Sequence, residues 1–224
     1  MTVSVGKCSV TLLSNDRRDR AMTGLEIQLS GREVQKEQFP CFLGVVFDAS
    51  FTFRRQVDKV VQKAEKGVRL LRRLAGSDWG WGKSLLRVTC LAVVRAVLLY
   101  GSAAWAPWVA PSVWERVERV FLGAARVVGG TLRSTPREAV LAEAGMQEVR
   151  KAAEGMWVAE LARCKEAQEG DPRREWGLKG VRRRLTRADW RSRAEGLWEE
   201  LWPGGVRSEE KVLGGEPWGL GPSN

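Results

Sequence analysis

Regularly spaced basic side chains are the residues of this sequence best suited to bind a ligand. They recur over positions 54–73, on the side of that segment opposite its apolar positions: Arg54, Arg55, Lys59, Lys63, Lys66, Arg69, Arg72 and Arg73. Side chains three and four residues apart are neighbours on a helix surface. Such a surface can contact successive phosphates of a nucleic acid without reading its bases. The spacing therefore predicts an electrostatic nucleic-acid contact, and a merely solvated basic helix face is the alternative.

The net charge of +10 is concentrated in the same part of the chain. Residues 51–110 hold 11 basic and 3 acidic side chains, whereas the rest of the chain holds 26 and 24. A concentrated basic segment favours a polyanionic partner, because each neutralised phosphate releases condensed counterions. Charge distribution and spacing thus point to the same segment.

The side chains most used in catalysis are scarce. The sequence has no histidine and four widely separated cysteines: Cys8, Cys41, Cys90 and Cys164. The lack of histidine removes the usual metal ligand and the usual general base near neutral pH. Without a C-x-x-C pair, neither a zinc site nor a disulfide framework is expected, and a reducing compartment is. We expect no cofactor or resident metal in this chain, although carboxylates alone can hold magnesium.

The first fifty residues are expected to form the edge of a β-sheet. Leu25, Ile27 and Leu29 alternate with polar residues, which is the period of a half-buried strand. Residues 39–47 form another apolar run with Gly44 inside it, where glycine marks a bulge or a close approach by another backbone. This edge is too small to be a domain by itself.

Helices are predicted after residue 50. The apolar positions of residues 57–74 have helical spacing, and residues 83–100 predict a second, more apolar helix that should be amphipathic and buried. No apolar run reaches the eighteen or so residues of a membrane span. Ser112 and Glu115 have the spacing of a capping box, which predicts the start of a third helix. Further helices are predicted over 136–144, 147–168 and 186–201, followed by a disordered end.

Four segments, in this order, resemble non-LTR retrotransposon reverse transcriptases. Residues 6–13 (GKCSVTLL) resemble the end of the palm, and residues 42–48 (FLGVVFD) resemble the primer-grip hairpin. Residues 92–105, which end in LYGSAAW, resemble the thumb helix, and residues 133–136 (RSTP) end a further family segment that starts near Arg126. The trypanosomatid ingi-like branch is the most similar. The resemblance extends over about residues 6–150.

The resemblance implies a right-hand fold that copies RNA into DNA with two magnesium ions held by palm aspartates. The F/Y-x-D-D motif that carries this chemistry is absent here, and Asp16 and Asp19 do not match it. We therefore expect no polymerase activity from this chain alone, and magnesium is implied only for the intact polymerase. Lys7 matches the family lysine that protonates the departing pyrophosphate, and an ordinary surface lysine is the alternative.

The resemblance also assigns a role to Phe42, Leu43 and Gly44. These residues correspond to the primer grip, a tight hairpin that lies against the primer strand, and an ordinary buried strand is the alternative. Residues 47–50 superficially resemble the start of an RNase H domain. That interpretation is disfavoured because helices, not strands, are predicted after Asp48.

Together these features predict an α+β, mainly α fold with a small antiparallel β-edge. Residues 1–50 would end the palm, residues 51–130 would form a helical thumb-like region, and residues 131–224 a helical extension. The expected partners are an RNA–DNA hybrid and the missing palm and fingers in trans, with no membrane, at an intracellular and nuclear location. Two alternatives are a stand-alone basic nucleic-acid-binding module and a transposon relic without function.

Overall fold

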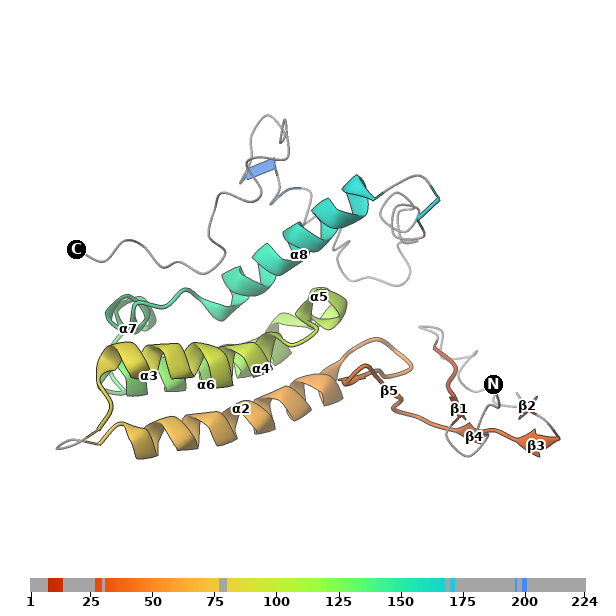
Figure 1. The fold of residues 1–224 in the computed structure, drawn as a ribbon, viewed down its shortest axis with the longest axis horizontal. Helices are drawn as coiled ribbons and strands as arrows, with labels where there is room; N and C mark the ends of the chain where they lie inside the picture. Colours follow the sequence, from red (N-terminus) through yellow and green to blue (C-terminus); the bar gives the residue numbers. More distant parts are fainter. Residues whose placement is uncertain are drawn as a thin grey trace.

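A computed structural model describes residues 8–13, 27–29, 31–76, 80–167, 170–171, 196 and 199–200. Within these residues the protein is α+β and mainly α, with short strands followed by a helical body (Figure 1). This confirms the predicted fold class. The strands are β1 (Ser9–Val10), β2 (Gln28–Leu29), β3 (Arg32–Glu33), β4 (Gln35–Lys36), β5 (Cys41–Phe42) and β6 (Val45–Val46).

The strands form three separate two-stranded pairs. β2 pairs with β3 and β5 with β6, both antiparallel as expected, whereas β1 and β4 run parallel. The run over residues 39–47 is a hairpin rather than one strand. Its turn has positive φ at Leu43 (47°) and Gly44 (82°), as in the type I′ turns that join two-residue hairpins. Gly44 therefore marks a turn, and not a bulge within a strand.

The helices are stacked side by side, with α2 on one side of the body and α8 on the other (Figure 1). Their bounds are α2 (Arg54–Leu74), α3 (Lys83–Thr89), α4 (Ala96–Leu99), α5 (Ser102–Trp105), α6 (Pro111–Gly129), α7 (Arg137–Ala144) and α8 (Val149–Glu166). A π-helical segment, η2 (Cys90–Arg95), joins α3 to α4, and a 3₁₀ turn, η3 (Ala106–Trp108), follows α5.

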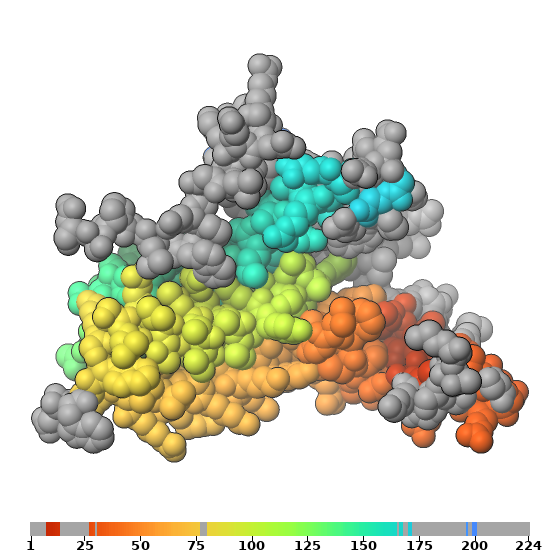
Figure 2. Space-filling model, viewed as in Figure 1, coloured from red at the N-terminus to blue at the C-terminus, as the bar shows by residue number. Residues whose placement is uncertain are grey.

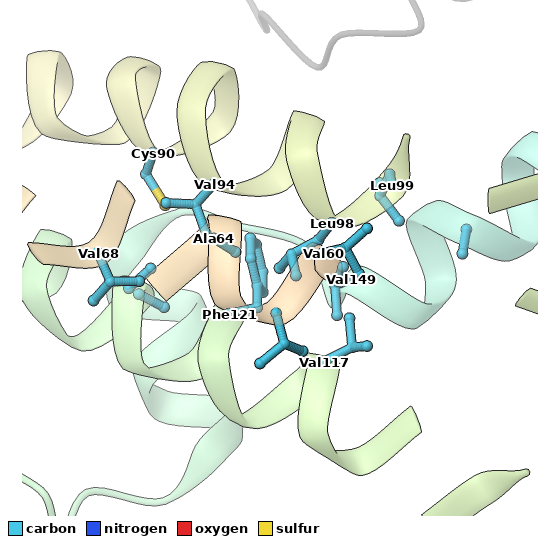
Figure 3. Packing of buried hydrophobic residues seen from close by; sticks show 14 of the residues in the cluster. Val60, Ala64, Val68, Cys90, Val94, Leu98, Leu99, Val117, Phe121 and Val149 are labelled. Atoms are coloured by element: carbon cyan, nitrogen blue, oxygen red, sulfur yellow. The ribbon is translucent and has the colours of Figure 1, made fainter. Parts of the chain in front are cut away.

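One hydrophobic core joins these helices. Figure 3 shows residues of α2, of the α3–α4 helix and of α6 meeting in it, among them Val60, Ala64, Val68, Cys90, Val94, Leu98, Val117 and Phe121. The cluster of buried residues extends from Val45 to Trp157. The cluster therefore contains residues from both sides of position 130. The boundary predicted there, between a thumb-like region and a helical extension, stays a prediction.

The π-helical segment has a packing explanation. The buried positions of this helix, Leu86, Cys90, Val94 and Leu98, recur every four residues, which is wider than the 3.6 of an α-helix. The wider π turn keeps this row on the side that faces the core. Gly67 of α2 permits the contact, because a Cβ there would lie 3.0 Å from Val93 Cγ1.

The 83–100 helix buries one side, as expected of an amphipathic helix, and Leu85 and Val88 on its outer side are 47% and 59% exposed. One expectation about these helices was wrong. The capping box is absent: α6 begins at Pro111 and has no side-chain cap. The backbone N–H groups of Val113 and Trp114 donate instead to the carbonyl oxygen of Ala110. Proline fixes φ at a helical value, so the helix starts one position before Ser112.

Within the described part of the chain, one helical segment is long and apolar enough to cross a membrane. It spans Lys83–Trp108, and it qualifies by length and composition alone. A core helix of a soluble protein passes the same test. Here the row from Leu86 to Leu98 packs in the core.

Some predicted features lie outside the described residues. These are Lys7, Asp16, Asp19 and nearly all of the helix expected over 186–201. The C-terminal end that was expected to be disordered also lies there.

Candidate nucleic-acid interface

α2 separates its apolar and basic residues onto opposite sides. Val57, Val60, Ala64, Val68 and Leu71 are buried on the inner side. All eight predicted basic residues lie on the remaining surface, where Lys59 is half-buried and the other seven are exposed. Figure 2 shows α2 (orange) at the surface along its length. Arg72 and Arg73 occupy the last turn, where positive charge is favourable near the helix C-terminus.

Five of the basic residues follow the outer ridge of α2. This ridge is a row of six positions whose spacings alternate between four and three residues. Gln62 occupies one position, and basic residues occupy the other five: Arg55, Lys59, Lys66, Arg69 and Arg73. From first to last the row covers about 27 Å at 1.5 Å per residue. Two acidic residues lie on the same helix, and one of them, Asp58, is 2.6 Å from Arg116 Nη1 of α6. The other, Glu65, is exposed and precedes Lys66 in the sequence, so one carboxylate lies beside the ridge.

The structure divides the eight basic residues into two groups. The ammonium of Lys59 donates a 2.9 Å hydrogen bond to the carbonyl oxygen of Gly44, and the Arg55 guanidinium lies 3.8 Å from the centre of the Phe39 ring. Among the described residues, the other six have no side-chain hydrogen bond or ion pair: Arg54, Lys63, Lys66, Arg69, Arg72 and Arg73. Two of the predicted phosphate contacts are thus engaged with the hairpin segment, and six are available to a ligand.

The β5–β6 hairpin is fitted closely against the end of α4. The hydroxyl of Tyr100 donates a 2.9 Å hydrogen bond to the carbonyl oxygen of Leu43. A Cβ on Gly44 would lie 3.1 Å from Tyr100 Cε1, and one on Gly101 would lie 2.8 Å from Val45 Cγ2. Both glycines also have positive φ, so a larger residue would be strained at either position.

Polar groups beneath the hairpin connect it to α2. The backbone N–H of Val46 donates to Gln56 Oε1 at 2.9 Å, and Gln56 is buried. Asp48 accepts hydrogen bonds from the N–H groups of Thr52 (2.9 Å) and Phe53 (2.6 Å) just before α2 begins. Burial alone would raise the pKa of Asp48, but these bonds and those from the Thr52 and Ser50 hydroxyls hold it below its ordinary value. Asp48 is therefore a carboxylate that orders the start of α2.

The tip of the hairpin is exposed and apolar. Phe42 and Leu43 are 66% and 77% exposed, so the alternative of an ordinary buried strand does not describe them. The β5–β6 hairpin lies at the N-terminal end of α2 (Figure 1), where the carbonyl oxygen of Gly44 accepts the hydrogen bond from Lys59. The predicted grip residues and the predicted basic residues thus form neighbouring parts of one surface.

Sequence reasoning missed Tyr100, Gln56 and the supporting role of Asp48. Tyr100 is the single tyrosine of the sequence, and Gln56 is a polar residue beside the apolar side of α2, so each carried a weak signal. Their partners could not be read from spacing. Among the described residues, no group of three histidine, cysteine, aspartate or glutamate side chains could hold a metal ion.

Comparison with curated proteins finds a relative that matches part of the chain. The chain is 31% identical over 101 residues to the "Retrovirus-related Pol polyprotein from type-1 retrotransposable element R1 4" of Nasonia vitripennis. Those residues are 45% of this chain and 26% of that relative, so the chain matches about a quarter of the relative's length. No protein-family model matches the sequence, and no solved structure matches it. The similarity supports a retrotransposon-derived protein of polymerase-related origin.

Proposed function

We propose that this chain is the primer-gripping and thumb-like part of a retrotransposon reverse transcriptase. Its role would be to hold an RNA–DNA primer-template duplex through phosphate contacts. The observation that carries the proposal is the set of six exposed basic side chains of α2 that have no partner among the described residues. Six unpartnered cations on one exposed helix surface are poorly explained by stability of the fold alone, because they repel one another.

The dimensions of the ridge fit this ligand. The six available cations, from Arg54 to Arg73, span about 28 Å of helix at 1.5 Å per residue. Adjacent phosphates of one strand are about 3.4 Å apart along a duplex axis, so about eight lie within this length, and those on the side facing α2 would be contacted. Contacts of this kind recognise charge and shape and carry no base information. The protein would therefore bind hybrids of different sequence with similar affinity.

Polymerisation itself is not part of the proposed role of this chain. Nothing in the sequence matches the paired aspartates that hold magnesium in the family it resembles. The palm and fingers would supply the metal ions and the reaction, and this chain would supply the grip. Assignment to the trypanosomatid ingi-like branch remains part of the proposal.

A second candidate is a stand-alone nucleic-acid-binding module. The observation that favours it is the continuous core from Val45 to Trp157, which joins α2 through α8. This candidate shares the α2 contact with the first and differs in needing no palm. Cooperative unfolding of the isolated chain would support it, and a chain that folds only together with a palm would exclude it.

Binding of an RNA–DNA hybrid by charge-reversal variants tests the shared contact. The test variant changes Lys63, Lys66 and Arg69 to glutamate. The control variant changes three exposed basic residues that lie outside α2 and have no partner among the described residues: Arg119, Arg133 and Lys151. Both variants change the net charge equally. The proposal requires the test variant to lose at least tenfold more affinity than the control, and equal losses would refute it.

A further inference from the structure

The side of the α3–α4 helix that faces away from the core is apolar. The π-helical segment gives this helix a repeat of four residues, which keeps the row from Leu86 to Leu98 buried. The opposite row is exposed, and Leu85 is 47% exposed beside it. Figure 2 shows the helix (yellow to yellow-green) at the surface next to α2 (orange). We call the exposed residues the outer strip: Leu85, Val88, Ala92, Ala96 and Tyr100.

The outer strip has cations on both of its sides. Arg87 and Arg95 are half-buried and occupy a neighbouring row of the same helix. On the other side the helix packs on α2, where a Cβ on Gly67 would lie 3.0 Å from Val93 Cγ1. Lys63 lies one turn before Gly67 on that side of α2 and is exposed. Among the described residues, the side chains of these three cations form no hydrogen bond or ion pair.

This arrangement specifies the chemistry of a partner. Apolar side chains can pack on the outer strip, and carboxylates beside them can pair with the flanking cations. Residues 83–108 include no aspartate or glutamate that would repel those carboxylates. The small side chains of Ala92 and Ala96 lie in the middle of the outer strip, where they allow another helix to approach to about 8–10 Å between axes. From Leu85 to Tyr100 the outer strip covers about 22 Å, or about four turns of such a helix.

Two other occupants match these features less well. A second copy of the same surface would bring Arg87 and Arg95 against cations of the same kind. A lipid surface is bound best by large apolar side chains that protrude, whereas Ala92 and Ala96 are small. The charges argue against the first occupant, and the shape argues against the second.

We infer that the outer strip docks an amphipathic helix of a partner protein that carries acidic residues on both sides of its apolar row. The apolar row packs on Ala92 and Ala96. The carboxylates pair with Arg87 and Arg95 on one side and with Lys63 on the other. The inference goes beyond the proposed function, because the outer strip lies on the α3–α4 helix and not on the ridge of α2.

The test measures binding of fluorescent helical peptides by the whole chain. One peptide of leucine, alanine and glutamate has leucines at spacings of three and four, with glutamates on both sides. A second has the same composition in an order that leaves no side apolar, and a third has lysine in place of glutamate. The folded wild-type protein should bind the first at least about tenfold more tightly than the other two. Absence of binding to the first peptide, or equal affinity for all three, would overturn the inference.

Two variants locate the docking site. Ala96→Gln places a longer polar side chain in the middle of the outer strip and should weaken binding of the first peptide at least about tenfold. Ala159→Gln, at an exposed alanine of α8, is the matched control and should leave the affinity unchanged. Equal effects of these two substitutions would overturn the inference.

A charge variant and a lipid measurement complete the test. Arg95→Gln should weaken binding of the first peptide about two- to fivefold, the effect of one lost ion pair. No change in this variant would contradict the role of the flanking cations. Vesicles of phosphatidylcholine and phosphatidylserine provide the lipid comparison. If they bound the wild-type protein more tightly than Ala96→Gln while the first peptide did not bind, the inference would be overturned in favour of a lipid surface.

Discussion

The hydroxyl of Tyr100 lies 2.9 Å from the carbonyl oxygen of Leu43, to which it donates a hydrogen bond across 57 residues of sequence. This bond joins Tyr100, which lies between α4 and α5 just before Gly101, to the turn of the β5–β6 hairpin. The close fit around it depends on two glycines, Gly44 and Gly101, at which a Cβ would meet a neighbouring side chain. The hairpin is thereby part of the same packed unit as the helices.

Replacing Gly101 with alanine should destabilise the protein. The new Cβ would lie 2.8 Å from Val45 Cγ2, and the residue has φ of 61°, so we expect the free energy of unfolding to fall by roughly 1–3 kcal/mol. Gly123 of α6 is a matched control, because a Cβ there meets nothing within 4 Å. Gly123→Ala should raise the free energy of unfolding by about 0.5–1 kcal/mol. Urea unfolding measures the free energy of unfolding of both variants. A change of the same sign in the two would contradict the close contact between Gly101 and Val45.

Asp48→Asn should lower stability in a pH-dependent way. The carboxylate accepts four hydrogen bonds, so its loss should cost about 1–3 kcal/mol near neutral pH. Because its folded pKa lies below the ordinary value of 3.8, the ionised carboxylate contributes stability above that pH. The contribution is lost as pH falls through the folded pKa. Urea unfolding of both proteins should therefore show a gap that narrows below about pH 4. A gap that stays constant from pH 7 to pH 3 would argue against this role.

Two leucines of the α3–α4 helix should respond differently to the same change. Leu98 is fully buried and Leu85 is 47% exposed. Leu98→Ala should reduce the free energy of unfolding by about 2–5 kcal/mol, because it leaves a cavity in the core. Leu85→Ala should cost less than about 1 kcal/mol. Thermal or urea unfolding distinguishes them, and similar losses would mean that the outer side of this helix is covered by protein.

The α2 cations that contact the hairpin segment should differ from the available ones in their effects on stability and on binding. Lys66→Gln should leave the free energy of unfolding unchanged. It should make the slope of the logarithm of hybrid affinity against the logarithm of salt concentration shallower by about one, which is the effect of one lost phosphate contact. Lys59→Gln should lower the free energy of unfolding by about 1 kcal/mol, since the Gly44 carbonyl loses its partner. If Lys66→Gln and Lys59→Gln changed the salt dependence of binding and the free energy of unfolding equally, the division of the cations into two groups would be wrong.

The amphipathic character of α2 could be predicted from the sequence because it depends only on local spacing. Apolar residues from Val57 to Leu71 recur at three and four, and the structure buries them. The same reasoning identified the segment of the hairpin but placed Gly44 within a strand, since a short apolar run does not reveal where it reverses direction. The capping box at Ser112 was displaced by Pro111, a competing start signal one residue earlier.

The contacts that complete the candidate interface could not be predicted in this way. The bonds from Tyr100 to Leu43 and from Lys59 to Gly44 join residues far apart in the chain, and their formation depends on how helices pack. Lys59 has the same spacing as the other cations, so sequence alone grouped it with them. Whether any of these residues contacts nucleic acid stays a prediction that only binding can decide.

The most direct test of that prediction is the salt dependence of RNA–DNA hybrid binding by the wild-type chain and by the variant with Lys63, Lys66 and Arg69 changed to glutamate. If α2 holds the phosphates, the logarithm of the wild-type affinity falls steeply and linearly with the logarithm of salt concentration, and the slope of the variant is shallower by about three. An identical slope in the two proteins, or no binding at low salt by a chain shown to be folded, would contradict the proposal.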